Sequence, residues 1–74
     1  MEGKYVMINY NTPILFNSVL EHKQFNKIGV NITSAGFFYA TKSDGVVYGR
    51  SQTLKINSKA EDKMWIDILI KPEF

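Results

Sequence analysis

The chain has 74 residues, of which 45% are hydrophobic and 22% charged, and its net charge is +2. This length predicts one domain over residues 1–74 with a thin core, because a chain of this size buries only about 60% of its unfolded surface. The absence of cysteine excludes disulfides and thiolate metal sites. No segment has the ~20 apolar residues that a membrane-spanning helix needs. We therefore expect a soluble cytoplasmic protein without a metal or other cofactor.

The first predicted element is a strand at residues 5–10. Its sequence, Tyr-Val-Met-Ile-Asn-Tyr, is rich in β-forming residues and apolar on both faces, which favours a central place in a sheet. The next three residues, Asn11-Thr12-Pro13, predict a turn.

Residues 14–28 have two interpretations. In the first, one helix covers the whole segment. In the second, residues 14–17 form a short strand and a helix follows at residues 19–28, because Ser18 and Glu21 have the spacing of a capping box. We prefer the second, since the Ile-Leu-Phe run that opens the segment has no helical spacing.

A β-hairpin is the most specific pattern in the chain. Apolar residues recur through residues 30–42 and 46–56, and Asp44-Gly45 lies between these two runs. Asp-Gly is typical of a two-residue type I′ turn, whose central residues both need positive φ. The sequence therefore predicts two antiparallel strands with a short connection.

A second helix is predicted at residues 59–70. Ser58 and Glu61 repeat the capping-box spacing, and apolar residues follow at helical intervals: Ala60, Met64, Trp65, Ile68 and Leu69. The alternative is a strand at residues 64–70, but the cap favours the helix. Together the elements predict an α+β fold, in which an antiparallel or mixed sheet of three to four strands has two helices packed on one face.

A two-residue turn would give the hairpin two unlike faces. One face would pair Tyr39 with Arg50 and Phe37 with Gln52, beside Tyr48. A guanidinium among aromatic rings can stack on a base or bind a phosphate, and it also resembles a protein–protein hot spot. These five residues are the predicted binding site.

The opposite face of the hairpin would carry small side chains, namely Gly36, Ala40, Gly49, Ser51 and Thr53. Small side chains let another element approach closely, and we expect a helix to cover this face. A connection one residue longer would exchange the two faces, because side chains alternate along a strand.

The sequence shows no catalytic pattern. His22 is the only histidine, and no orienting acid or nucleophile can be assigned to it. The adjacent acids Glu61 and Asp62 are explained by the start of a helix, where the dipole favours anions. The glycines form no phosphate-binding loop. We therefore expect a protein that is not an enzyme.

Two functional hypotheses follow. The first is a small interaction module that binds another macromolecule, acts as a homo-oligomer such as a homodimer, and serves as an accessory or inhibitor protein of bacterial or viral origin. The alternative is a binder of a nucleotide, a small anion or single-stranded nucleic acid through the predicted aromatic site. The small net charge weighs against a duplex-DNA binder.

Overall fold

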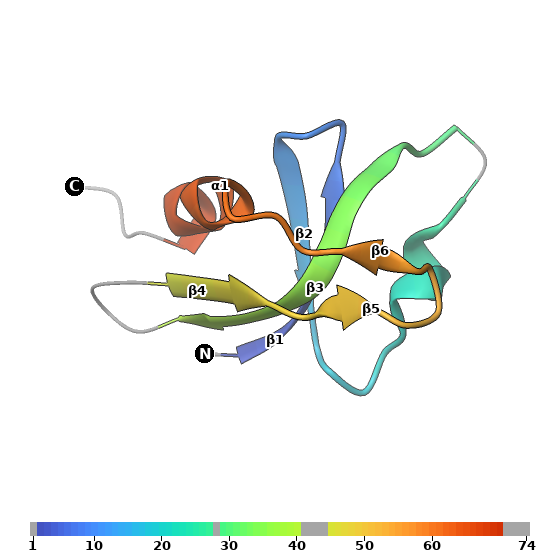
Figure 1. The fold of residues 1–74 in the computed structure, drawn as a ribbon, viewed down its shortest axis with the longest axis horizontal. Coiled ribbons are helices and arrows are strands. Elements are labelled where there is room, and N and C mark those ends of the chain that lie inside the picture. The colour runs from blue at the N-terminus through green and yellow to red at the C-terminus, as the bar shows by residue number, and fades with distance from the viewer. Residues whose placement is uncertain (1, 28, 41–44, 71–74) are drawn as a thin grey trace.

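The computed structural model describes residues 2–27, 29–40 and 45–70. Within them lies an antiparallel sheet of four strands in the order β2-β1-β3-β4, with one helix, α1, against it (Figure 1). The elements are β1 (Glu2–Ile8), β2 (Thr12–Phe16), the 3-10 helix η1 (His22–Phe25), β3 (Ile32–Ala40), β4 (Gly45–Tyr48), β5 (Arg50–Ser51), β6 (Ile56–Asn57) and α1 (Asp62–Ile70). This arrangement confirms the α+β class.

The strand predicted at residues 5–10 ends early. β1 stops at Ile8, and Asn9 and Tyr10 have φ values of 50° and 68°. The Asn11 N–H donates a hydrogen bond to the Ile8 carbonyl at 3.2 Å. Two central residues with positive φ define a type I′ turn. The turn therefore begins two residues before the predicted one, because Asn and Tyr take up the left-handed conformation that the sequence pattern did not suggest.

The short strand predicted at residues 14–17 is confirmed as β2, which covers Thr12–Phe16. The single-helix interpretation of this segment is therefore wrong. β2 includes Pro13, which cannot donate a ladder hydrogen bond. That residue is tolerated because β2 is an edge strand of the sheet.

The helix predicted at residues 19–28 is not found, and only the four residues of η1 are helical; residue 28 lies outside the described part of the chain. The capping box lies three residues later than predicted, since the Glu21 N–H donates to Gln24 Oε1 at 2.7 Å. Short helices are marginal in water, so tertiary contacts decide whether they form. Here the contacts of His22 and Phe25 with the sheet hold a single 3-10 turn.

The hairpin is confirmed, but its register differs from the prediction. Phe37 pairs with Tyr48, Tyr39 with Val46, and Ala40 with Gly45. The connection therefore spans four residues instead of two, and residues 41–44 lie outside the described part of the chain. Because the length differs by an even number, each side chain of β3 and β4 keeps the face that the sequence predicted for it.

The strand predicted at residues 46–56 is broken at Gly49. Its φ of +73° lies outside the β region, so the chain leaves the sheet after β4. β5 and β6 then form a separate two-stranded sheet, with a turn closed by a 2.8 Å hydrogen bond from the Lys55 N–H to the Ser51 carbonyl. Gly49 is the one local signal of this break in the sequence, because glycine weakens a strand interior.

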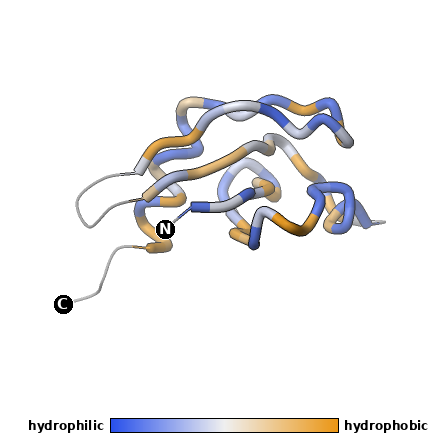
Figure 2. The backbone as a smooth tube through the Cα atoms, turned by 90° about the horizontal axis from the view of Figure 1, so that it is seen from below, coloured by the Kyte–Doolittle hydropathy of each residue, from blue (hydrophilic) through white to orange (hydrophobic). Residues whose placement is uncertain are grey.

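The core lies between α1 and one face of the sheet. Its buried residues come from β1, β3 and α1, and they are Tyr5, Met7, Phe38, Ala40 and Ile66. α1 thus covers the face that carries Ala40, whereas Gly49, Ser51 and Thr53, which were predicted on the same face, lie at or beyond the break in the strand. Hydrophobic segments occur on both the strands and the C-terminal helix in Figure 2. The same face carries Gly36, where an added Cβ would lie 2.6 Å from the Tyr48 carbonyl oxygen, so the close approach of the neighbouring chain requires glycine.

The N-terminus of α1 differs from the predicted cap. The predicted helix at residues 59–70 begins instead at Asp62, and the Ser58 hydroxyl donates to the Gly49 carbonyl at 2.8 Å. Asp62 accepts two hydrogen bonds at one carboxylate oxygen, from the Lys59 N–H at 3.0 Å and from the Tyr5 hydroxyl at 2.6 Å. This buried pair ties the start of the helix to the central strand.

Candidate binding surface

The sheet face opposite α1 carries a row of side chains that crosses all four strands. Lys4 of β1 pairs with Phe16 on one side and with Phe37 on the other, and Phe37 pairs with Tyr48. Directly paired residues in neighbouring strands project from the same face. The row therefore places three aromatic rings and one lysine side by side.

One end of this face is exposed. The Phe37 and Tyr48 rings stack with centroids 5.7 Å apart and an interplanar angle of 19°. In the next row Tyr39 pairs with Val46, and the exposed fractions of Tyr39, Val46 and Tyr48 are 50%, 52% and 48%. We call these four residues, Phe37, Tyr39, Val46 and Tyr48, the open patch. Large apolar side chains gathered on one face of a sheet are a common feature of binding surfaces.

The other end of the same face is covered by η1. The His22 ring lies edge-on to Phe16 and to Phe37, with centroids 5.5 and 5.8 Å away, and Phe25 packs on Phe16 at 4.3 Å. Lys4 Nζ donates to the Leu20 carbonyl at 2.8 Å. The segment that carries η1 therefore closes part of the aromatic row. The prediction that both helices pack on one face is wrong.

His22 is buried between the η1 segment and the sheet. Its Nε2–H donates a 2.8 Å hydrogen bond to the Gly36 carbonyl, and only 3% of the residue is exposed. Burial lowers the pKa of His22 below its usual value of 6.5, and the nearby Lys4 ammonium lowers this pKa further, whereas the bond to Gly36 acts in the opposite direction. With one ring nitrogen bound to a carbonyl and phenylalanines on both sides, the imidazole is arranged as a packing group.

The structure brings together three of the five predicted site residues. Phe37, Tyr39 and Tyr48 share the open patch, but Arg50 and Gln52 do not pair with them. Arg50 follows the break at Gly49 and pairs with Asn57 in β5–β6, and the exposed Gln52 lies in the following turn. The altered register and the break separate these two residues from the rings.

Sequence reasoning missed the other members of this surface. Lys4 precedes the strand predicted at residues 5–10, Phe16 lies in the strand predicted at residues 14–17, and Val46 begins the strand predicted at residues 46–56. Lys4 lies two residues before Val6 in β1, so the two side chains project from the same face of the strand. Phe16 pairs with Lys4 once β2 is placed beside β1. No local pattern specifies that pairing, since it joins residues from two strands whose order the sequence does not encode.

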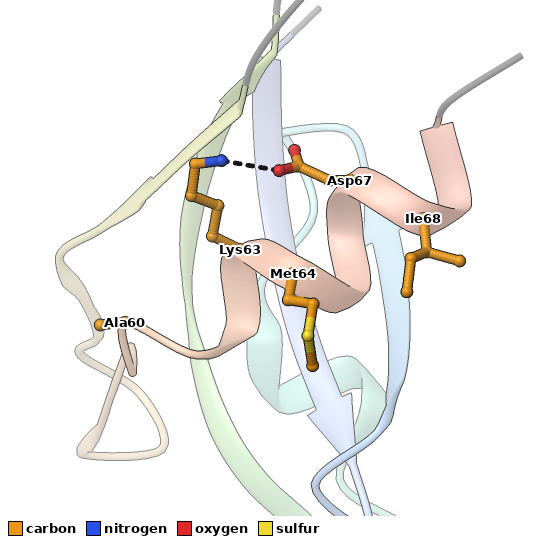
Figure 3. Close-up of a pocket in the computed structure, with 5 residues that line it drawn as sticks. All are labelled: Ala60, Lys63, Met64, Asp67 and Ile68. Atoms are coloured by element: carbon orange, nitrogen blue, oxygen red, sulfur yellow. Dashed lines mark hydrogen bonds and ion pairs between the residues drawn. The ribbon is translucent and has the colours of Figure 1, made fainter.

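A second apolar surface lies on the outer side of α1. Met64, Ile68 and Leu69 have exposed fractions of 53%, 63% and 55%. Met64 and Ile68 line a surface pocket with Ala60, Lys63 and Asp67, and the Lys63 ammonium binds the Asp67 carboxylate at 2.7 Å (Figure 3). The helix is therefore apolar on its outer side as well as on its buried side.

No group of three or more His, Cys, Asp or Glu side chains that could hold a metal ion occurs among the described residues. Nor does any helix in residues 2–27, 29–40 and 45–70 have the length and apolar character to cross a membrane.

The chain matches no protein-family model, and comparisons with curated proteins and with solved structures also find no match. The functional argument therefore depends on the two apolar surfaces alone.

Proposed function

We propose that this protein is a non-enzymatic interaction module that binds another protein through the open patch. The observation that carries the proposal is the half-exposure of Tyr39, Val46 and Tyr48 on one face of a sheet whose other face packs against α1. Aromatic residues on a rigid scaffold are enriched in protein–protein hot spots, because they bury much area and lose little conformational entropy.

The charges beside the open patch favour a protein partner over a nucleic acid. In the sheet register, acidic Glu2 pairs with Tyr39 and basic Lys4 pairs with Phe37. Among the described residues, this one acid and one base next to the rings form no positive stripe that could follow a phosphate backbone. The alternative ligand, single-stranded nucleic acid or a nucleotide, is supported by the Phe37–Tyr48 stack alone.

A photo-crosslinking amino acid placed at Tyr48 tests the proposal in the cells that make the protein. We expect one discrete adduct of protein mass, since the ring position lies at the centre of the proposed contact. Adding Tyr39→Ala should reduce its yield about tenfold or more, the change that corresponds to the loss of one aromatic hot spot. The same crosslinker at Val19, which is 83% exposed and remote from the open patch in sequence, is the matched control.

Three results would contradict the proposal. Equal adducts from positions 48 and 19 would indicate unspecific collision, and no adduct at 48 would show that the surface has no partner. An adduct removed by nuclease treatment would instead favour the nucleic-acid alternative.

We further propose that the module self-associates through the outer side of α1. Exposed apolar side chains gathered on one side of a helix are typical of an interaction surface, and Met64, Ile68 and Leu69 of α1 are exposed in this way. The chemistry of the surface suits a second copy. A two-fold axis across the helix reverses the order of its charges, so Lys63 of one copy would face Asp67 of the other. The patch is small, so the dimer should be weak.

Sedimentation equilibrium of the purified chain tests this dimer. We expect a concentration-dependent increase in mass, and the double variant Met64→Gln and Ile68→Gln should raise the dissociation constant about tenfold or more, because four apolar contacts are lost per dimer. Val19→Gln, at a position that is 83% exposed and lies outside α1, should leave the mass distribution unchanged. A wild-type chain that stays monomeric at millimolar concentration would exclude self-association.

A further inference from the structure

The segment that carries η1 covers the aromatic row through only a few contacts. Phe25 packs on Phe16, Lys4 Nζ binds the Leu20 carbonyl, and His22 Nε2–H binds the Gly36 carbonyl. Two neighbouring side chains, Val19 and Leu20, are exposed rather than packed on the sheet. A short 3-10 turn with so little buried apolar surface belongs to the part of a fold that opens at low free-energy cost.

His22 is the centre of these contacts. Its ring lies between Phe16 and Phe37, and its Nε2–H donates a hydrogen bond to the Gly36 carbonyl in β3. This position suits a neutral imidazole, because the low-dielectric surroundings of two phenylalanines penalise a charge.

The charged groups around His22 do not compensate a proton on the ring. β1 contributes the Lys4 ammonium, which has the same sign as a protonated imidazole. On η1 itself, Glu21 and Lys23 form an ion pair at 3.3 Å with largely solvent-exposed side chains. β2 and β3 contribute no charged side chain, since their sequences are Thr-Pro-Ile-Leu-Phe and Ile-Thr-Ser-Ala-Gly-Phe-Phe-Tyr-Ala.

We infer that His22 is an acid-sensitive latch, which holds the η1 segment on the sheet when neutral and releases it when protonated. Release would uncover Phe16 and the buried side of Phe37, and so extend the open patch along the aromatic row. This inference rests on the proposed function in one respect: the enlarged surface would serve the same partner-binding face. The opening itself requires no partner.

The sign of the pH effect follows from the burial of the ring. Because the closed state lowers the pKa of His22, the open state binds more protons once the pH falls below 6.5. Acidification therefore favours opening, and the closed state is most stable above that pH. Between pH 7.5 and 5.0 the opening constant should rise up to about thirtyfold, the limit for one group with an open-state pKa near 6.5.

Amide hydrogen exchange of the purified chain measures this opening. The Gln24 and Asn26 amides, which donate to the Glu21 and Lys23 carbonyls at 3.1 Å, report on η1. After correction for intrinsic exchange rates, their protection should fall up to about thirtyfold from pH 7.5 to 5.0. The lowest pH, 5.0, stays above the usual pKa values of carboxyl groups, so their titration contributes little to the change in protection. In His22→Gln, whose amide can still donate to Gly36 but does not titrate, protection should change less than about twofold.

Dilute urea separates local opening from unfolding of the whole domain. Opening of η1 exposes little surface, so its exchange should be insensitive to urea, whereas the amide of buried Met7 in β1 should exchange faster. Equal urea dependence at Gln24 and Met7 would overturn the latch, as would pH-independent protection of η1 in the wild-type chain. These two results come from the wild-type chain alone, so they hold even if His22→Gln does not fold.

The failure of the latch is distinguishable from the failure of the proposed function. The exchange experiment contains no partner, and the crosslinking experiment at Tyr48 is done at neutral pH, where the latch is closed. A partner adduct together with pH-independent exchange would refute the latch and leave the binding function supported.

Discussion

Replacing Asp62 with alanine should lower the free energy of unfolding by about 3 kcal/mol. The carboxylate is 1% exposed and accepts hydrogen bonds from the Tyr5 hydroxyl and the Lys59 N–H. Its removal would leave a buried hydroxyl and a helix-terminal N–H without their acceptor, and each unsatisfied group costs about 1–3 kcal/mol. Urea unfolding followed by far-UV circular dichroism measures the change.

Glu61→Ala is the matched control, because the preceding carboxylate is exposed and lies at the same helix end. It should cost less than about 1 kcal/mol. If Asp62→Ala lowers the free energy of unfolding no more than Glu61→Ala does, the buried hydrogen bond between Asp62 and Tyr5 contributes little to stability.

The partner of Asp62 adds a test by pH. Burial raises the pKa of Tyr5 above its usual value of 10.0, and the hydrogen bond to Asp62 raises this pKa further. Stability that depends on the protonated phenol is therefore fully present below pH 10 and is lost as the pH rises above it. Relative to Tyr5→Phe, the wild-type chain should lose about 1.4 kcal/mol per pH unit in that range. Parallel pH profiles for the two chains would contradict this assignment.

Replacing Phe38 with alanine should cost about 3–5 kcal/mol and bring the domain close to unfolding. Phe38 is 3% exposed and belongs to the core cluster with Tyr5 and Ile66. Truncation of a buried phenylalanine loses its transfer free energy and leaves a cavity. A domain of this size has only about 4–11 kcal/mol of stability in total. Thermal unfolding should show a large decrease in the midpoint temperature.

Tyr39→Ala, one residue later on the same strand, is the internal control for this experiment. Its ring is half exposed on the opposite face, so the expected cost is below about 1 kcal/mol. This contrast also supports the crosslinking test, in which Tyr39→Ala must stay folded. A large loss of stability at Tyr39 would show that the open patch is part of the core.

The sequence predicted the parts of this fold that have a local cause. The Asp-Gly pattern, the apolar run after Pro13 and the helical spacing from Met64 onward depend on residues close together in the chain, and the structure confirms a hairpin, β2 and α1 there. The sequence also predicted that Phe37, Tyr39 and Tyr48 share one face. That prediction depends only on whether the connection has an even or an odd number of residues, because side chains alternate along a strand.

The helix expected at residues 19–28 shows where local patterns stop being decisive. Two capping signals, at Ser18 and at Glu21, compete within this segment, and the difference between a helix and one 3-10 turn is small in free energy. The contacts of His22 with Phe16 and Phe37 are enough to favour the 3-10 turn over the longer helix. These contacts join residues from β2, η1 and β3, which no spacing rule connects.

By itself, then, the sequence determined the fold class, one hairpin, the C-terminal helix and an aromatic face, because backbone propensity and side-chain periodicity act over a few residues. Only the tertiary structure decided that Gly49 ends the strand before Arg50, that α1 and η1 cover opposite faces, and that the open patch remains exposed. Those outcomes depend on which surfaces pack together, and these surfaces come from residues that are far apart in the sequence. The open patch consists of the side chains on this sheet face that η1 leaves wholly or partly exposed.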